Sequence, residues 1–333
     1  MTRQRIELRR SVLTLLLVVI TIAPFMSTVA SASTRSRTIP VPSQPDALVR
    51  TGNIIWVASC SGDAITEINA GTKRVSETLS NVSTSSYEFD CPDALAIDGS
   101  NIWVANYLGD TMTEFNSSTG ALVRIISGIE SPRGLAVNGP NIWVLNGNPS
   151  LHKAVLTEFN TGDGSQVNAL IDEVTGNGWT LVSPTCIVSI GNKFWVGDSG
   201  AMEFSSASGK FIGTLRGAGA SCITYDRGRL WVCNGDDRDV LEYNASTRRY
   251  IKVIDDVPFA DYLVSSGNDL FVIAENPGDS VREYDTSNDK LVGVIDRSNV
   301  GHDKGIGPLL VDGASLWAAN YSAGTVTVIP LRH

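Results

Sequence analysis

The stretch Asp93-Ala-Leu-Ala-Ile-Asp-Gly-Ser-Asn-Ile-Trp-Val-Ala-Asn106 decides the fold of this 333-residue chain. It consists of two short apolar runs separated by Asp98-Gly99-Ser100-Asn101, a sequence typical of a tight β-hairpin. The same pattern occurs seven times, and an aromatic residue marks the middle of each second run. The markers are Trp56, Trp103, Trp143, Trp195, Trp231, Phe271 and Trp317.

The spacing of these markers predicts the architecture. Consecutive markers lie 47, 40, 52, 36, 40 and 46 residues apart. A period of about 40 to 50 residues made of short strands is typical of β-propeller blades. Six copies have glycine four residues before the marker, whereas the fifth has Arg227 followed by Gly228. A glycine at a constant hairpin position indicates a backbone with positive φ.

A third strand and, after a polar turn, a fourth strand follow in the first six copies. The seventh copy reaches Leu331 without a fourth strand, and the unassigned run Thr38–Val41 is available to supply it. We therefore predict an all-β fold, a seven-bladed β-propeller of four-stranded antiparallel blades. The N-terminal strand completes the last blade and closes the ring, which leaves no open sheet edge.

Residues 1–32 have the composition of a secretory signal peptide. Arg3, Arg5, Arg9 and Arg10 precede the apolar run Val12–Phe25, and Ala30-Ser31-Ala32 is a small-residue cleavage signal. The pair Arg9-Arg10 also resembles a twin-arginine export signal, and an uncleaved leader would act as an anchor. We expect a secreted or extracytoplasmic protein in which residues 33–333 form the propeller domain.

Charge and composition exclude several classes of partner. The leader holds four arginines and one glutamate, so its removal changes the formal charge from −9 to −12. An acidic chain without a basic aromatic stripe is poorly suited to nucleic acid. After Phe25 no apolar run is long enough for a transmembrane domain. We expect a monomer.

Five cysteines in an exported protein indicate disulfide bonds and one leftover thiol. Cys222 and Cys233 lie opposite each other in the hairpin of the fifth copy, and Cys60 and Cys91 lie on the same face of neighbouring blades. A Cys186–Cys222 bond is a rival pairing, because Cys186 occupies the repeat position of Cys222 one blade earlier. Five reduced cysteines are the remaining alternative.

Surplus length gathers on one face of the predicted wheel. The turns between first and second strands and between third and fourth strands are short and alike. The longer connections, Ser80–Asp90, Gly147–Lys153, Asp172–Val182 and Arg297–Gly307, all open on the opposite face. We call these the constant face and the variable face. Variable loops on a rigid scaffold usually carry function, so we expect a site at the mouth of the central channel on the variable face.

Polar residues converge on that face by repeat position. Three residues after the marker stand Asn106, Asn146, Asp198, Asn234 and Asn320, and ten before it stand Asp46, Asp93, Arg133 and Asp261. The long loops add Tyr87, Glu88, Trp179, His152 and His302. A divalent cation, calcium or magnesium, could be bound by four of the carboxylates, namely Asp46, Asp93, Asp198 and Asp261. The alternative is structural, because repeated Asn and Asp also satisfy strand-end backbone groups in every blade.

Glutamates recur on the third strand in six copies. They are Glu67, Glu114, Glu158, Glu203, Glu242 and Glu283. Six copies at one repeat position indicate a structural role or a solvated strand face.

The chain resembles the bacterial β-propellers with YVTN-type or streptogramin-lyase-like repeats. The resemblance rests on the motifs IWVAN at Ile102–Asn106, LWVCN at Leu230–Asn234, PRGLAV at Pro132–Val137 and TEFN-SSTG at Thr113–Gly120. Lyases of this family open a lactone ring with histidines, a glutamate and magnesium, and lactonase propellers bind calcium. This chain departs from the lyase pattern, because it has three histidines and no His-x-Glu or Glu-x-His pair at a blade end.

We therefore expect a binding or interaction module that recognises a protein, peptide or glycan ligand through Arg133, Trp179, Tyr87, Glu88 and the asparagines. The alternative is a metal-assisted lyase or lactonase with His302 or His152 as the base.

Overall fold

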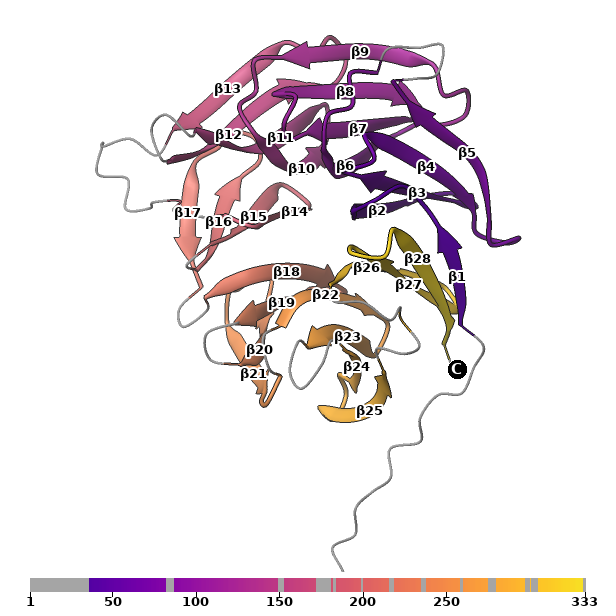
Figure 1. Cartoon of the computed structure of the whole chain (residues 1–333). Helices are drawn as coiled ribbons and strands as arrows, with labels where there is room; N and C mark the ends of the chain where they lie inside the picture. Colours follow the sequence, from indigo (N-terminus) through magenta and orange to yellow (C-terminus); the bar gives the residue numbers. More distant parts are fainter. Residues whose placement is uncertain are drawn as a thin grey trace, which may run out of the picture.

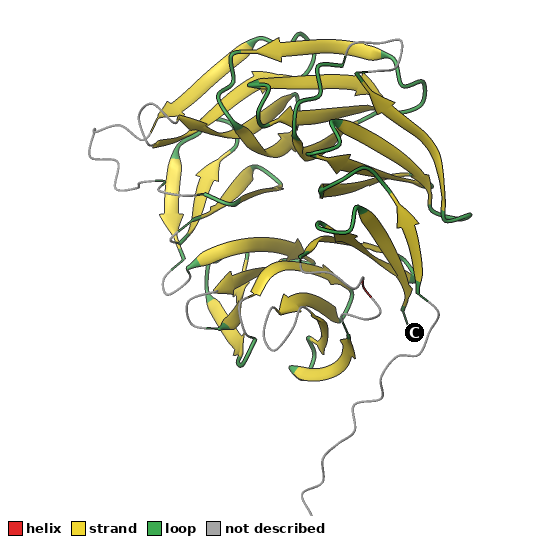
Figure 2. Cartoon of the chain, viewed as in Figure 1, coloured by secondary structure: helices red, strands yellow, loops and turns green. Residues whose placement is uncertain are grey.

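The protein forms a ring of seven β-sheets. The computed structural model describes residues 36–81, 87–148, 153–171, 181, 184–198, 200–215, 219–234, 238–257, 260–274, 280–296, 300 and 305–331. Within these ranges, 28 strands make seven four-stranded sheets around a central axis (Figure 1). Strands account for nearly all of the regular structure (Figure 2). The predicted seven-bladed propeller is confirmed.

Each blade consists of four consecutive strands, and the last blade borrows one. Blade 1 contains β2 (Pro45–Thr51), β3 (Ile54–Ser59), β4 (Ala64–Asn69) and β5 (Arg74–Ser80). Blade 2 contains β6 (Pro92–Asp98), β7 (Asn101–Asn106), β8 (Thr111–Asn116) and β9 (Leu122–Ser127). Blade 3 contains β10 (Pro132–Asn138), β11 (Asn141–Asn148), β12 (Lys153–Asn160) and β13 (Gln166–Ile171). Blade 4 contains β14 (Cys186–Ile190), β15 (Lys193–Gly197), β16 (Ala201–Ser205) and β17 (Phe211–Thr214).

The remaining three blades follow the same order. Blade 5 contains β18 (Ala220–Asp226), β19 (Arg229–Asn234), β20 (Asp239–Asn244) and β21 (Tyr250–Ile254). Blade 6 contains β22 (Ala260–Ser266), β23 (Asp269–Ala274), β24 (Ser280–Asp285) and β25 (Lys290–Ile295). Blade 7 contains β26 (Ile306–Asp312), β27 (Ser315–Asn320), β28 (Thr325–Pro330) and the N-terminal β1 (Arg37–Pro40).

Pairing of the two ends of the described chain closes the ring. β1 runs antiparallel to β28, with Thr38 opposite Thr327 and Ile39 opposite Val326. Ile39 is buried in the same apolar cluster as Trp317 and Leu48, which belong to blades 7 and 1. The predicted closing strand is therefore confirmed, one residue earlier in the chain than expected.

The first strand of every blade lies nearest the axis. β2, β6, β10, β14, β18, β22 and β26 each contact the first strands of both neighbouring blades, so that these strands form a closed inner ring. Antiparallel order then places the connections from second to third strand and from fourth to first strand at one end of the sheets. These are the connections of the variable face.

One of the predicted long connections is shorter than expected. β11 extends to Asn148 and β12 begins at Lys153, whereas we assigned Gly147–Lys153 to a loop. The two strands continue their pairing through Asn148 and Lys153, so only residues 149–152 connect them. The other three long connections lie partly outside the described residues.

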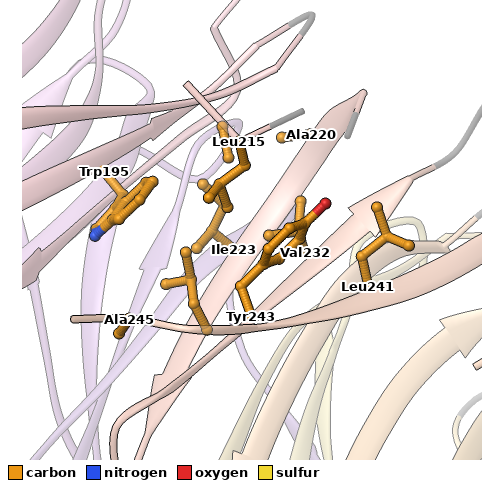
Figure 3. Packing of buried hydrophobic residues seen from close by; sticks show 10 residues of the cluster. Trp195, Leu215, Ala220, Ile223, Val232, Leu241, Tyr243 and Ala245 are labelled. Atoms are coloured by element: carbon orange, nitrogen blue, oxygen red, sulfur yellow. The ribbon is translucent and has the colours of Figure 1, made fainter. Parts of the chain in front are cut away.

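The marker aromatics fill the spaces between adjacent sheets. Six tryptophans and Phe271 are 0 to 2% exposed. Trp195 of blade 4, for example, packs against Ile223, Val232 and Tyr243 of blade 5 (Figure 3). Burial of a large aromatic side chain stabilises the fold by roughly 2 to 3 kcal/mol. The repeated marker therefore contributes strongly to the packing between adjacent blades.

The hairpin glycines adopt the backbone that their position requires. Gly99, for example, has φ +57° and Gly313 has φ +53°. In blade 5 the arginine that replaces this glycine keeps the left-handed conformation, with φ +47° at Arg227 and +82° at Gly228. The hairpin geometry is therefore conserved among the blades even where its usual residue is not.

Two disulfide bonds form, as predicted. Cys60 at the end of β3 bonds to Cys91 before β6 and so links blades 1 and 2. Cys222 and Cys233 face each other across the β18–β19 hairpin and are also bonded. Cys186 is the free thiol, so the rival Cys186–Cys222 pairing is wrong.

Four of the six recurring glutamates are buried inside the blades, and Glu67 and Glu283 are partly buried. Glu114, Glu203 and Glu242 are fully buried. Their carboxylates pair with Arg124, with Lys193 and with Arg229, respectively. A buried carboxylate requires such a partner, and the structural interpretation of this repeat position therefore holds for these three residues.

Candidate binding site around the central axis

A β-bulge at the start of the first strand governs which side chains lie around the axis. In six blades the register of the first strand shifts ten residues before the marker. The skipped residues in the first three blades are Asp46, Asp93 and Arg133. A bulge redirects the extra side chain and is common beside functional sites.

Residues at or beside this repeat position also connect neighbouring blades. The Thr185 hydroxyl of blade 4 donates a hydrogen bond to the carbonyl oxygen of Ser221 in blade 5, at 2.6 Å. The Ser221 hydroxyl donates in turn to the carbonyl of Ala260 in blade 6, at 2.8 Å. These bonds link blades 4, 5 and 6, and we call the residues at this repeat position in all seven blades the belt.

Three charged residues of this belt interact across blades 1 to 3. Burial and, to a smaller extent, the neighbouring charge of Asp93 together raise the pKa of Asp46 to about 7. Burial also raises the pKa of Asp93 to about 6, an effect that the positive charge of Arg133 opposes. Perturbed carboxyl groups at a concave end of a fold are typical of binding and catalytic sites.

An aromatic side chain lies against one of these charges. The guanidinium of Arg133 lies 4.3 Å from the ring centre of Tyr107, a cation–π contact between blades 3 and 2. Leu108 follows Tyr107 in the chain and is 63% exposed. Tyr321 of blade 7 occupies the repeat position of Tyr107 and is 41% exposed. We call Asp46, Asp93, Arg133 and Tyr107 the axial cluster.

Sequence reasoning missed Tyr107. Its signal was the aromatic residue four positions after the marker, which recurs as Tyr321 in blade 7. The Tyr321 hydroxyl accepts a hydrogen bond from the Gln44 side chain of blade 1, so this tyrosine also bridges two blades.

The predicted asparagines are turned into the blades. Asn106 is fully buried, and its amide donates to the hydroxyls of Thr111 and Thr113 at 2.9 and 3.0 Å. The Thr113 hydroxyl donates to the carbonyl of Tyr87 at 2.6 Å, and Tyr87 belongs to the connection from blade 1. This relay ties the end of a second strand to the preceding blade.

Blade 7 repeats the relay. The Asn320 amide donates to Thr325 and Thr327, both at 2.9 Å, and the Thr327 hydroxyl donates to the carbonyl of Val300 at 3.0 Å. In blade 3, Asn146 accepts from the Thr157 hydroxyl at 3.1 Å. Asn234 and Asp198 occupy the same position and are also buried. The arrangement favours the structural interpretation of this ring over the ligand-binding one.

Tyr87 and Glu88 lie in different environments although they are adjacent. Tyr87 is 4% exposed, stacks on Phe89 with ring centres 4.9 Å apart, and donates to the carbonyl of Gly120 at 2.6 Å. These contacts occupy the Tyr87 side chain in packing between blades 1 and 2. Glu88 is exposed and has φ +53°, so it remains accessible from the variable face.

Several predicted site residues lie outside the described residues. These are Trp179, His152 and His302. The backbone of Asp261 is part of β22, but its side chain is not described. The structure therefore brings together Asp46, Asp93 and Arg133 from the predicted set and says nothing about convergence of the other four.

Few side chains that could act as metal ligands lie close together among the described residues around the axis. Within the described ranges, no group of three or more His, Cys, Asp and Glu side chains is close enough to hold one. Asp46 and Asp93 are neighbouring carboxylates that would supply part of the six to eight oxygen ligands of calcium. Backbone carbonyls or water would have to supply the others.

Comparison with known proteins identifies the fold alone. No protein-family model and no curated protein sequence matches the chain. A chain of the mitotic checkpoint complex is similar over 98% of this chain and 100% of its own length, with TM-score 0.70 and 15% identity. U3-55K aligns over 91% and 100% of the two chains, with TM-score 0.69 and 12% identity. The computationally designed Ika8 protein aligns over 88% and 98%, with TM-score 0.63 and 12% identity.

No helix among the described residues has the length and apolar character needed to cross a bilayer.

Proposed function

We propose that this protein is an extracytoplasmic binding module that recognises a protein, peptide or glycan with the axial cluster on its variable face. The observation that carries the proposal is the row of bulges that brings Asp46, Asp93 and Arg133 together beside Tyr107. Clusters of arginine and aromatic side chains are typical of recognition surfaces.

The charges of the cluster favour a ligand with polar groups of both signs. Asp46 and Asp93 accept hydrogen bonds, and Arg133 donates them from a planar guanidinium. Tyr107, the exposed Leu108 and Tyr321 add flat apolar surface at the rim. Trp179, in the long connection after blade 3, would extend this surface by stacking on a sugar or an aromatic side chain.

Two features support a location outside the cytoplasm. Disulfide bonds persist in oxidising compartments and are rare in the cytosol, and this chain forms two of them. Residues 1–32 have the pattern of a secretory signal peptide. Amino-terminal sequencing of the exported protein would locate the cleavage site expected after Ala32.

The binding proposal is tested on arrays of glycans and peptides with the folded, oxidised protein. We expect the wild-type protein to bind at least one ligand of the arrays. The substitutions Arg133→Gln and Asp93→Asn should each lower the affinity for that ligand by about 10-fold or more, as expected for loss of a charge-assisted hydrogen bond. Lys290→Gln, a change of an exposed charge at the first residue of β25, serves as the matched control. Equal binding by all four proteins would overturn the proposal.

A second candidate function is catalysis, and it rests on the raised pKa of Asp46. A carboxyl group that titrates near neutral pH beside a second carboxyl is suited to general acid–base chemistry. Calcium or magnesium held by these carboxylates would make a metal-assisted lyase or lactonase the class to test. Lactone turnover that disappears in Asp46→Asn, together with a bound divalent ion in the wild-type protein, would favour catalysis over simple binding.

A further inference from the structure

A separate cavity lies on the constant face, between blades 5 and 6. Its volume is about 290 Å³, at the small end of the range for ligand pockets, roughly 300 to 1,000 Å³. It is lined by Asp226, Arg227, Arg229, Trp231, Gly267, Asn268, Thr286 and Ser287. These residues belong to the first hairpins of both blades and to the turn that joins β24 and β25.

The cavity lies at the one hairpin whose sequence differs from those of the other blades. In the other six blades the hairpin position of Arg227 is glycine. Arg227 adopts φ +47°, a conformation that disfavours residues with a Cβ atom. An arginine is not needed to form the hairpin or the interface between blades, because the other six blades form both with glycine at this position.

The hairpin of blade 6 makes room for the Arg227 side chain. A Cβ atom on Gly267 would lie 2.8 Å from an Nη atom of Arg227. At Gly52, Gly99, Gly139, Gly191 and Gly313 the same added atom would meet nothing within 4 Å. Arg227 therefore reaches across the blade boundary and lies over the turn that contains Gly267.

The other cations of this region already have partners. Arg229 pairs with the fully buried Glu242. The Lys252 ammonium pairs with Asp289 and donates to the carbonyl of Thr286 at 2.6 Å. Both cations neutralise charge inside the sheets, so they contribute little positive charge to the cavity.

Arg227 differs from Arg229 and Lys252 in its partners. Among the described residues, the one carboxylate within 4 Å of Arg227 is that of its neighbour Asp226, 3.4 Å from Nε, and the arginine side chain is 61% exposed. The Nη groups extend away from that contact toward blade 6. The Ser287 hydroxyl and the Asn268 amide line the same cavity and are further hydrogen-bond donors.

We propose that this cavity binds a small ligand through one oxyanion group, with Arg227 as the principal contact. A guanidinium binds a carboxylate, sulfate or phosphate with two parallel hydrogen bonds. Ser287 and Asn268 complete the donor set, and Asp226 and the carbonyl groups of the two hairpins accept from hydroxyls on the remainder of the ligand. The site is independent of the axial cluster, which lies on the opposite face.

Calorimetric titration of the folded protein with glucuronate, glucose and inorganic phosphate tests the proposal. We expect glucuronate or phosphate to bind with a dissociation constant on the order of 1 mM and glucose to bind at least 10-fold more weakly. Arg227→Gln should weaken oxyanion binding by about 10- to 100-fold. Binding of glucuronate but not phosphate assigns the site to organic acids, and the reverse assigns it to free phosphate.

Two further variants separate loss of the contact from loss of the fold. Arg227→Gly restores the residue of the other six hairpins, so we expect an unchanged or higher melting temperature and the same loss of binding. Arg249→Gln removes an exposed positive charge from the same face of the same blade and should leave binding unchanged. Oxyanion binding that survives both Arg227 variants, or that is no tighter than glucose binding, would overturn the proposal.

Discussion

The two faces of the wheel use the same repeat in different ways. On the constant face, tight hairpins keep one geometry, and nearby buried glutamates such as Glu114 and Glu242 have cationic partners within their own blade. On the variable face, connections differ in length, and the bulged first strands bring Asp46 and Asp93 together. Among the described residues, no cation offsets the burial of Asp46. The two ends of the sheets therefore differ in how their charged side chains are neutralised, and this difference is repeated in several blades.

The cross-links of the molecule support this division. Both disulfide bonds lie toward the variable end of their sheets, at the ends of second strands and the starts of first strands. The two strands that each bond links are not joined by a turn at that end. Covalent bonds there limit the freedom of the unfolded chain where the repeat itself supplies least order.

Loss of the cross-links should give the largest effect. The Cys60–Cys91 bond spans 31 residues and the Cys222–Cys233 bond spans 11. Chain entropy then predicts losses of about 4 kcal/mol for Cys60→Ser with Cys91→Ser and about 3 kcal/mol for Cys222→Ser with Cys233→Ser. Urea unfolding of both double variants measures the difference. A larger loss from the shorter bond would contradict the entropic explanation.

Asparagines on the two faces should contribute different amounts to the free energy of unfolding. Asn106→Ala removes two buried hydrogen bonds on the variable face and leaves two threonine hydroxyls without their donor, so we expect a loss of about 2 kcal/mol. Asn116→Ala removes exposed contacts that cap a constant-face turn, to the backbone amides of Ser118 and Thr119. There we expect about 0.5 to 1 kcal/mol.

Denaturant titrations of the two asparagine variants give the comparison. Equal losses would mean that the relay from Asn106 to the preceding blade adds nothing to an ordinary turn cap.

The pH dependence of stability should report the axial carboxyls. Because burial raises the pKa of Asp46 to about 7 and of Asp93 to about 6, the folded state holds protons that the unfolded state releases above pH 4. Their contribution to stability is therefore present at low pH and is lost as pH rises from about 4 to 7. Asp46→Asn should raise the free energy of unfolding at pH 7.5 by about 1 kcal/mol, a figure reduced for contact with solvent.

Melting curves of wild type and Asp46→Asn between pH 4.5 and 8 test this sign. The variant should show the smaller change with pH. A variant that loses stability at pH 7.5 would show that the Asp46 carboxylate is stabilised by a partner rather than strained by burial.

The smallest effect concerns the remaining thiol. Cys186 packs between blades 4 and 5, and burial raises its pKa to about 11. Since thiolate is the reactive form, alkylation of the native protein at pH 8 should be about 100-fold slower than in 6 M guanidinium, with no change in the two disulfide bonds. Rapid native labelling would place this thiol in solvent.

Much of the fold could be predicted from residues that repeat. The tryptophan markers and hairpin glycines predicted seven blades, and the missing fourth strand of the last copy predicted closure through Thr38–Val41. The paired positions of Cys222 and Cys233 followed from the hairpin. These features are local or periodic, so they survive in the sequence without coordinates.

The site was less predictable, for physical reasons. A β-bulge adds one residue without changing the spacing between markers, so periodicity gave the position of Asp93 but not its displacement from the ladder. The asparagine ring looked polar and accessible, yet Asn106 is buried and its amide nitrogen donates to threonines two positions apart on the next strand. The Arg133–Tyr107 contact joins two blades, and a pairing across a blade boundary leaves no pattern within either repeat.

Hydrogen–deuterium exchange with the ligand selected by the arrays tests the central claim most directly. Binding at the axial cluster predicts slower exchange in residues 91–94, 105–108 and 131–134, with no change at residues 226–229 and 267–268. Protection confined to residues 226–229 and 267–268, with the axial segments unchanged, would contradict recognition on the variable face.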